Sequence, residues 1–325
     1  MKAGHAFELF VKRILLNIGF SEVASDNLYI FDGAPGQMIQ GLGEAHNADV
    51  LLDPPVQTPF YWPTRLLIEC KDYKSKVGLN IVRSALGLRE DINHFEILDA
   101  DELEARRNPR RTKMHYDDKR YLYQVAIASI NGFTSPAQRF ASTHRIPLIE
   151  FSKMPFWRAF CDLLKEGYGI NPFDRYSVKH PDERLTDTDI INKINNLADE
   201  VSKNMAIAIT NNGQILFLFR INGQKNFFEE RYTLSWHTKN EPWLLCTGNI
   251  EYIFQLPNEI AKAWLSNVSS ELELKREAIN CKMNLLSNMV VYYKDNNRTV
   301  IKMISIDEDE LKKAQNKLYY NNLEE

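Results

Sequence analysis

Two acidic residues and a lysine in the first quarter of the chain have the types and spacing of a metal-dependent hydrolytic site. Asp49 lies in the apolar stretch "ADVLLD", and the next apolar run, "RLLIECK", carries Glu69 and Lys71 at its end. Side chains two positions apart on a strand point to the same face, so Glu69 and Lys71 share one. Mg²⁺ takes oxygen ligands, commonly one or two carboxylates together with substrate phosphate and water. The residues therefore indicate phosphodiester hydrolysis.

Each residue of this set has an expected role. Asp49 and Glu69, on neighbouring strands, would hold Mg²⁺, for which Mn²⁺ would substitute, and the Cys70 backbone carbonyl would add an oxygen ligand. The metal would activate water and stabilise the charge that develops on phosphorus. Lys71 would orient the water or neutralise the transition state. Glu8, at the margin of the apolar stripe of the first helix, would hold Lys71 or a water molecule.

Every member of the set also has a structural explanation without chemistry. A Glu-x-Lys pair occurs on any strand with a solvated face, Asp49 can be an ordinary strand-end acid, and Glu8 an ordinary helix-surface acid. The ordered combination favours a site: an acid at a helix edge, an acid in one strand, then acid-x-lysine in the next.

The elements that position these residues follow from local patterns. Apolar residues from 5 to 19 recur with the period of a helix, which Gly19 is expected to end. The Gly-rich stretch 33–47 is expected to be a loop, and the proline-rich stretch 54–63 a connection between strands. We expect strands at 48–53, 65–70, 121–130 and 146–151, and helices at about 80–95 and after the N-cap Ser135. This order predicts an α/β domain with a mixed central sheet and flanking helices.

Residues 4–151 resemble the Mrr-like branch of the PD-(D/E)xK restriction-endonuclease superfamily. "GHAFELFVKRILLNIGF" is similar to its opening helix, "ADVLL" to the segment with its metal-binding aspartate, and "LLIECK" to its (D/E)-x-K strand. "VAIASINGFTSPAQRFASTHRIPLIEF" is similar to its later strand, turn, helix and final strand. Ala48 stands where the motif has proline, and the stretches 54–63 and 99–120 are insertions. The resemblance implies a Mg²⁺-dependent nuclease with Asp49, Glu69 and Lys71 as its core set and Glu8 as an accessory acid.

Basic residues are candidates for contacts with nucleic acid. Neutralisation of phosphates by such side chains gives salt-dependent binding, although a solvated loop would have the same composition. No P-loop is present, so an NTPase step would need a separate partner protein. The candidates are Lys74 and Lys76 after the catalytic strand, and Arg106, Arg107, Arg110, Arg111 and Lys113 in "ARRNPRRTK".

The second half of the chain changes in character and resembles no family that we identify. We place a nuclease domain at 1–165, a linker at 166–189 and an α+β domain at 190–325, with an antiparallel sheet and a long helix from Pro257 to about Leu286. Recognition, dimerisation and partner docking remain open as its role. For Trp236 and Trp243, packing in a core is favoured over stacking on bases.

Composition sets the remaining bounds. A chain of 325 residues with 44% hydrophobic residues and a net charge of −3 suits two globular domains. The four cysteines are widely separated and indicate reduced thiols of a cytoplasmic protein. No stretch reaches the about 18 apolar residues that span a membrane.

The expected activity is Mg²⁺-dependent endonuclease cleavage of double-stranded DNA, in a restriction or anti-phage defence role. The alternatives are a catalytically silent nucleic-acid-binding adaptor on a nuclease-like fold, or a nuclease for RNA or branched DNA that a partner activates. A homodimer is also open.

Overall fold

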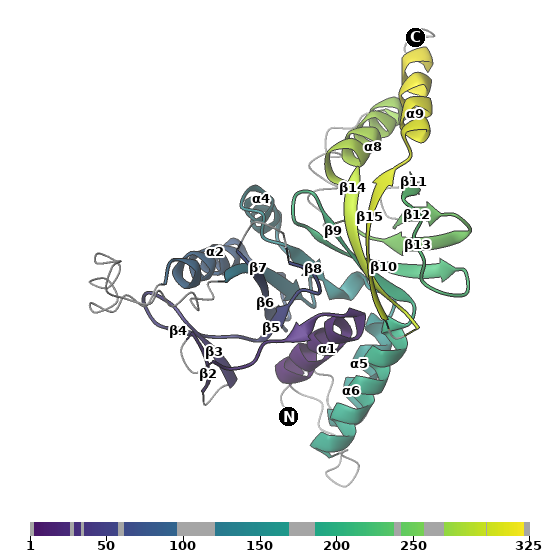
Figure 1. The fold of residues 1–325 in the computed structure, drawn as a ribbon. Coiled ribbons are helices and arrows are strands. Elements are labelled where there is room, and N and C mark those ends of the chain that lie inside the picture. Colours follow the sequence, from purple (N-terminus) through teal and green to yellow (C-terminus); the bar gives the residue numbers. More distant parts are fainter. Residues whose placement is uncertain are drawn as a thin grey trace, which may run out of the picture.

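A five-stranded mixed sheet forms the centre of the N-terminal half of the chain (Figure 1). Its strand order is β1-β5-β6-β7-β8, in which β5 is antiparallel to β1 and β6, while β6, β7 and β8 are parallel. The strands are β1 (Ser21–Glu22), β5 (Val50–Asp53), β6 (Thr64–Lys71), β7 (Leu122–Ser129) and β8 (Leu148–Glu150). This computed structural model describes residues 3–26, 29–33, 36–57, 62–95, 121–168, 186–236, 242–256, 270–296 and 298–321.

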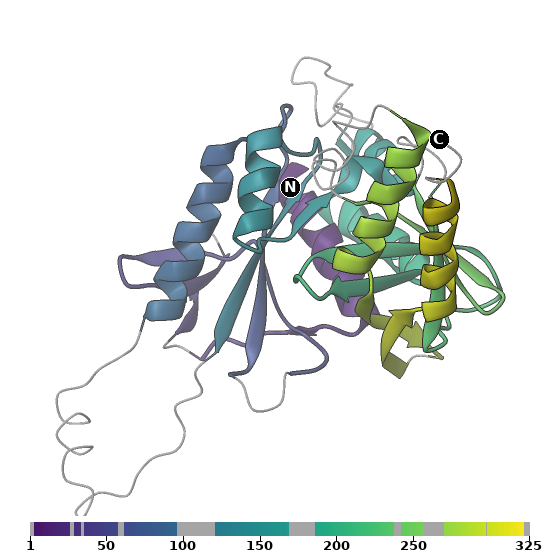
Figure 2. The same ribbon diagram turned by 90° about the horizontal axis from the view of Figure 1, so that it is seen from above.

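Helices cover both faces of this sheet because its strands are apolar on both sides. Alternate residues of β6 divide between two apolar clusters: Leu66 and Ile68 pack with α1, whereas Leu67 packs with α2 and α4. α2 and α4 lie side by side (Figure 2). The helices are α1 (Ala3–Ile18), α2 (Leu79–His94) and α4 (Ser135–Thr143). The predicted strands and helices of this half are confirmed, and the fold is mixed α/β.

The Gly-rich stretch 33–47 is not a loop, so this prediction is wrong. It contributes to a small antiparallel sheet in which β3 (Gly36–Gln40) pairs with β2 (Ile30–Gly33) and β4 (Ala45–Asn47). Ile30 and Ile39, which oppose each other across this sheet, are fully buried and pack in the same cluster as apolar residues of α2. These two isoleucines contribute to packing the short strands against α2. In the sequence they are isolated among glycines and polar residues.

The second half of the chain forms a closed barrel, and the antiparallel pairing that the sequence predicts holds for all but one of its neighbouring strand pairs. Its strand order is β10-β13-β12-β11-β15-β14-β9, and β11 and β15 are parallel. Hairpins join β9 to β10 and β14 to β15. The strands are β9 (Met205–Thr210), β10 (Ile215–Asn222), β11 (Arg231–Ser235), β12 (Trp243–Thr247), β13 (Ile250–Phe254), β14 (Asn288–Asp295) and β15 (Arg298–Ile306).

Two helices of the second half stand beside the barrel (Figure 1). α8 (Glu271–Leu285) begins after Ser270, whose hydroxyl accepts a hydrogen bond from the Glu273 amide, and α9 (Glu308–Asn321) follows β15. The helix predicted from Pro257 is therefore described only from Glu271, because 257–269 lie outside the described residues. No helix among the residues placed here is long and apolar enough to cross a membrane.

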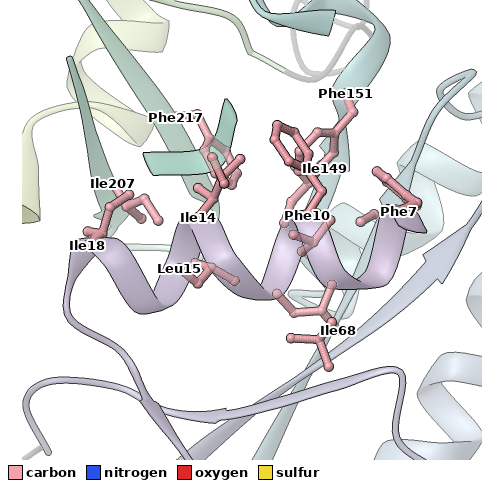
Figure 3. Close-up of a cluster of buried hydrophobic side chains, with 14 of the residues drawn as sticks. Phe7, Phe10, Ile14, Leu15, Ile18, Ile68, Ile149, Phe151, Ile207 and Phe217 are labelled. Carbon is pink, nitrogen blue, oxygen red and sulfur yellow. The ribbon is translucent and has the colours of Figure 1, made fainter. Parts of the chain in front are cut away.

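One apolar cluster joins the two halves of the chain. Phe151, in the short helix η1 (Phe151–Lys153), contacts Phe7 of α1 at 5.1 Å and Phe217 of β10 at 5.8 Å between ring centroids (Figure 3). The helices α5 (Trp157–Tyr168) and α6 (Asp187–Ser202) add residues to this cluster, and α6 packs along α1. This cluster therefore spans the predicted boundary at 166–189, most of which lies outside the described residues, whereas two other apolar clusters each lie on one side of it.

Candidate active site

The predicted catalytic residues meet where β6 ends and β5 begins. The antiparallel register pairs Val50 with Ile68, so the preceding residue, Asp49, comes opposite Glu69. Lys71 is the last residue of β6. Successive side chains of a strand point to opposite faces of the sheet. Asp49, Glu69 and Lys71 therefore lie on the same face as Leu51 and Leu67, which pack against α2 and α4. The structure thus brings together the three residues that the sequence indicates.

The ammonium of Lys71 lies close to both carboxylates. Lys71 Nζ is 2.7 Å from Glu69 Oε2 and 3.9 Å from Asp49 Oδ2. The three side chains are only 14–19% exposed. Burial lowers the pKa of Lys71, but the charge and hydrogen bond of Glu69 and the charge of Asp49 outweigh it, so the pKa is raised. Lys71 is therefore a firmly protonated cation at neutral pH.

Two donors hold the carboxylate of Asp49, one on each oxygen. The backbone amide of Cys70 donates to Oδ2 at 2.9 Å, and the side-chain amide of Asn47 donates to Oδ1 at 3.1 Å. Burial nevertheless raises the pKa of Asp49, against the hydrogen bond from Cys70 and the charge of Lys71. Sequence reasoning missed Asn47, although its position two residues before Asp49 is a signal that both side chains share a face.

Glu8 approaches the site from the N-terminal turns of α1. Burial raises its pKa, the hydrogen bond from His5 opposes this, and the charges of Asp49 and Asp72 add to the rise. Its described partner is His5, with 3.2 Å between His5 Nδ1 and Glu8 Oε2, and not the predicted Lys71. Sequence reasoning missed His5, which the spacing of one helical turn from Glu8 could have indicated.

The donor set fits a hard divalent cation in part. Asp49 and Glu69 offer carboxylate oxygens, and each ionised carboxylate keeps acceptor positions beyond those used by Asn47, Cys70 and Lys71. Within the described ranges, no three His, Cys, Asp or Glu side chains are grouped so that they could hold a metal ion. A bound Mg²⁺ would therefore need backbone, water and phosphate oxygens besides the two carboxylates, which is its usual coordination.

The backbone carbonyl of Cys70 is the predicted metal ligand, and its thiol has a different role. Burial raises the pKa of this thiol well above its ordinary value, and the nearby carboxylates of Asp49 and Glu8 add to the rise. Metal ligation and nucleophilic attack by cysteine need the thiolate. The Cys70 side chain therefore serves packing next to α1.

Lys74 and Lys76 lie in a segment that is fastened to the same edge of the sheet. Asn131 donates its side-chain amide to the Tyr73 carbonyl at 2.6 Å, and the Val77 amide donates to the Gly132 carbonyl at 2.9 Å. Lys74 and Lys76 are both exposed between these two attachments. They can therefore meet a ligand that approaches Lys71.

The chain that follows the long basic stretch rejoins the central sheet at the end of β6 opposite Lys71. Arg106, Arg107, Arg110, Arg111 and Lys113 lie outside the described residues, as does all of 96–120. The chain returns at Leu122, whose amide bonds to the Pro63 carbonyl just before β6 begins. The proline-rich connection 54–63 leaves the sheet at this end as well. The eight residues of β6 separate Lys71 from the points where Pro63 and Leu122 meet, and at about 3.3 Å per residue this is roughly 23 Å.

The two tryptophans of the second half belong to its core. Trp236 and Trp243 stack with ring centroids 5.1 Å apart and an interplanar angle of 4°. Trp243 is only 4% exposed, and Trp236 is partly buried against the barrel cluster. Core packing is therefore confirmed for this pair.

Comparisons with known proteins give this chain no family. No family model matches it, and neither does any curated protein. A crystal structure of a protein of unknown function, AF1548, matches with 14% sequence identity and a TM-score of 0.30, over 59% of this chain and 95% of that chain. A similarity this low carries no argument about fold or function.

Proposed function

We propose that this protein is a Mg²⁺-dependent nuclease that hydrolyses phosphodiester bonds, with Asp49, Glu69 and Lys71 as its catalytic set. The observation that supports this most is the meeting of the three side chains at one sheet edge, with Lys71 Nζ at 2.7 Å from Glu69 and 3.9 Å from Asp49. Two carboxylates and an ammonium, all largely withdrawn from water, are the groups needed to bind a cation and stabilise a phosphoryl transition state.

The residues act in distinct ways. A bound Mg²⁺ supplies Lewis acidity and an activated water. Asp49 and Glu69 hold the cation, with the Cys70 carbonyl as a further oxygen. The Lys71 ammonium, already paired with Glu69, neutralises charge on the phosphate or orients the attacking water. Glu8 is proposed to hold a water molecule at the site, and the charge of Asp49 contributes to the raised pKa of Glu8.

The surrounding fold is compatible with a restriction-endonuclease-like core. β5, β6, β7 and β8 form a mixed sheet with α1 on one face and α2 and α4 on the other. Together with the resemblance of residues 4–151 to the Mrr-like branch, this extends the proposal to a restriction or anti-phage defence role. The role itself rests on resemblance, which is a fold-level argument.

Double-stranded DNA is the proposed substrate. Lys74 and Lys76 are exposed beside the site and can neutralise phosphates next to the one that is cleaved. The arginines and lysine of "ARRNPRRTK" are proposed as further contacts with the phosphates of DNA.

A cleavage panel tests the proposal. Plasmid, linear double-stranded DNA, branched DNA, single-stranded DNA and RNA are each incubated with Mg²⁺, Mn²⁺ or EDTA, with Lys71→Ala protein as the control. The proposal predicts cleavage of plasmid with either metal, no cleavage in EDTA, and none by the variant. Cleavage that persists in EDTA or in the Lys71→Ala variant would contradict the proposal. Cleavage of RNA or branched DNA alone would contradict double-stranded DNA as the substrate.

A further inference from the structure

Asp49 occupies the junction between two sheets. Asn47 ends β4 of the small sheet, and Val50 begins β5 of the central sheet. Between them, the Ala48 amide donates to the Gln37 carbonyl of β3 at 2.8 Å, so the small sheet holds the backbone up to the residue before Asp49. The position of this carboxylate therefore depends on both sheets.

The orientation of the carboxylate depends on one side chain of the small sheet. The Asn47 amide donates to Oδ1 at 3.1 Å, while the Cys70 amide of the central sheet donates to Oδ2 at 2.9 Å. The terminal torsion of an aspartate is broad, so a single donor leaves the carboxylate plane free to turn. Two donors on opposite oxygens fix that plane.

The strand that carries Asn47 is anchored to α2. His46 Nε2 lies 2.6 Å from Asp91 Oδ2, and the Gly43 amide donates to Asp91 Oδ1 at 3.1 Å. The turn before β4 wraps so closely around this carboxylate that a Cβ on Gly41 would lie 2.0 Å from Asp91 Oδ2. Asp91 thus holds both the turn and the strand, and through them the Asn47 backbone.

We propose that Asn47 is a positioning residue, which sets the plane of the Asp49 carboxylate for binding of a divalent cation. The small sheet β2-β3-β4, fastened to α2 through His46 and Asp91, is the element that places it. This inference rests on the proposed nuclease function. Groups that orient a ligand of a metal typically change metal affinity or activity by about 10–100-fold when removed.

Binding of Mn²⁺ to the full-length protein, measured by electron paramagnetic resonance without DNA, tests the role of Asn47. Asn47→Ala and the similarly sized Asn47→Leu remove the donor. Gln37→Ala is the matched control, since this amide lies in the same small sheet but donates to the Val23 carbonyl, at 2.8 Å. Asp49→Ala reports whether the metal binds at the proposed site, and thermal melting shows whether each variant is folded.

The proposal predicts that both Asn47 variants bind Mn²⁺ about 10–100-fold more weakly, and that kcat for DNA cleavage falls while KM for DNA is unchanged. Gln37→Ala should stay within about twofold of the wild type. Wild-type affinity in folded Asn47 variants overturns the positioning role and leaves the nuclease proposal standing. An equal loss in Gln37→Ala also overturns it, because the integrity of the sheet would then be responsible. If Asp49→Ala binds Mn²⁺ as tightly as the wild type, the metal does not bind at Asp49, and both the proposed metal site and the positioning role of Asn47 are refuted.

Discussion

Lys71 Nζ and Glu69 Oε2 lie 2.7 Å apart at the end of β6, two positions apart on one strand. This ion pair leaves Asp49 as the less compensated carboxylate, at 3.9 Å from the same ammonium. Burial accordingly raises the pKa of Asp49 even though two hydrogen bonds and Lys71 favour its charged form. The site therefore holds a buried negative charge at a cost to folding, which a cation would offset.

Asp49→Asn should shift the stability of the metal-free protein in the variant's favour as the pH rises, since it removes a buried charge. The asparagine amide accepts only one of the two hydrogen bonds that Asp49 accepts, a cost that does not depend on pH. A carboxyl group whose pKa is higher in the folded state is favourable when protonated, below about pH 3.9, the ordinary value for aspartate. That contribution is lost as the pH rises through the raised folded pKa. In urea unfolding with EDTA, the stability of the variant relative to the wild type should therefore rise from pH 4 to pH 8. A stability difference that stays constant over this range would contradict the raised pKa of Asp49.

Phe151→Ala should destabilise both halves of the chain together. Phe151 is fully buried and contacts Phe7 of α1 and Phe217 of the barrel, and removal of a buried phenylalanine costs about 3–5 kcal/mol. The same change at Phe227, which is 42% exposed, is the control and should cost less than about 1 kcal/mol. Calorimetry should show one transition, shifted as a whole. Two separate transitions, only one of them shifted, would mean that the halves fold independently.

Two glycines of the α2 region should respond in opposite ways to alanine. A Cβ on Gly41 would lie 2.0 Å from Asp91 Oδ2 and 2.8 Å from the Glu44 carbonyl, so Gly41→Ala should cost about 1–3 kcal/mol. A Cβ on Gly87, within α2, would meet nothing within 4 Å. Gly87→Ala should therefore stabilise by about 0.5–1 kcal/mol, through helix propensity. Denaturant midpoints measure both. Gly41→Ala protein at least as stable as the wild type would refute the close packing of the turn on Asp91, and a destabilising Gly87→Ala would contradict the open space beside α2.

The ion pair between Arg13 of α1 and Asp199 of α6 should stabilise the folded protein at neutral pH but not at strongly acidic pH. The hydrogen bond from Arg13 lowers the pKa of Asp199, assisted by Asn17. The stability that this provides is present above about pH 3.9, the ordinary value, and is lost as the pH falls through the lowered pKa. Both side chains are about 40% exposed, so Asp199→Asn should cost no more than about 1 kcal/mol at pH 7. The difference should shrink below pH 4, and an undiminished difference at pH 2 would contradict the assignment.

Sequence predicts the central sheet well because its signals are local. The apolar run 121–130 forms β7, and the helical period over 5–19 forms α1, which ends at Ile18 and is followed by Gly19 with φ of +124°. The small sheet was missed because its strands are short and rich in glycine and polar residues. Closure of the barrel was missed because it depends on pairing between distant strands, such as β9 with β14 and β11 with β15.

The residues of the candidate site likewise divide into those that the sequence indicates and those that it does not. Asp49, Glu69 and Lys71 belong to apolar strands, so that their polarity is conspicuous in the sequence. Asn47 and His5 are less conspicuous because they lie in polar surroundings, although their spacing from Asp49 and Glu8 is local. The sequence also does not show that Leu122 lies at the opposite end of β6 from Lys71, since this follows from the parallel register of β6 and β7.

Single-turnover cleavage of supercoiled plasmid by the wild type and Glu69→Gln tests the central claim most directly. Glutamine keeps the size of the side chain but removes the charge that pairs with Lys71 and would bind the metal. With Mg²⁺ the wild type should cut, and the variant should be at least about 1,000-fold slower while melting as a folded protein. Addition of EDTA should abolish the wild-type cleavage. Cleavage by the variant at the wild-type rate, or undiminished cleavage in EDTA, would contradict a metal-dependent nuclease at this site.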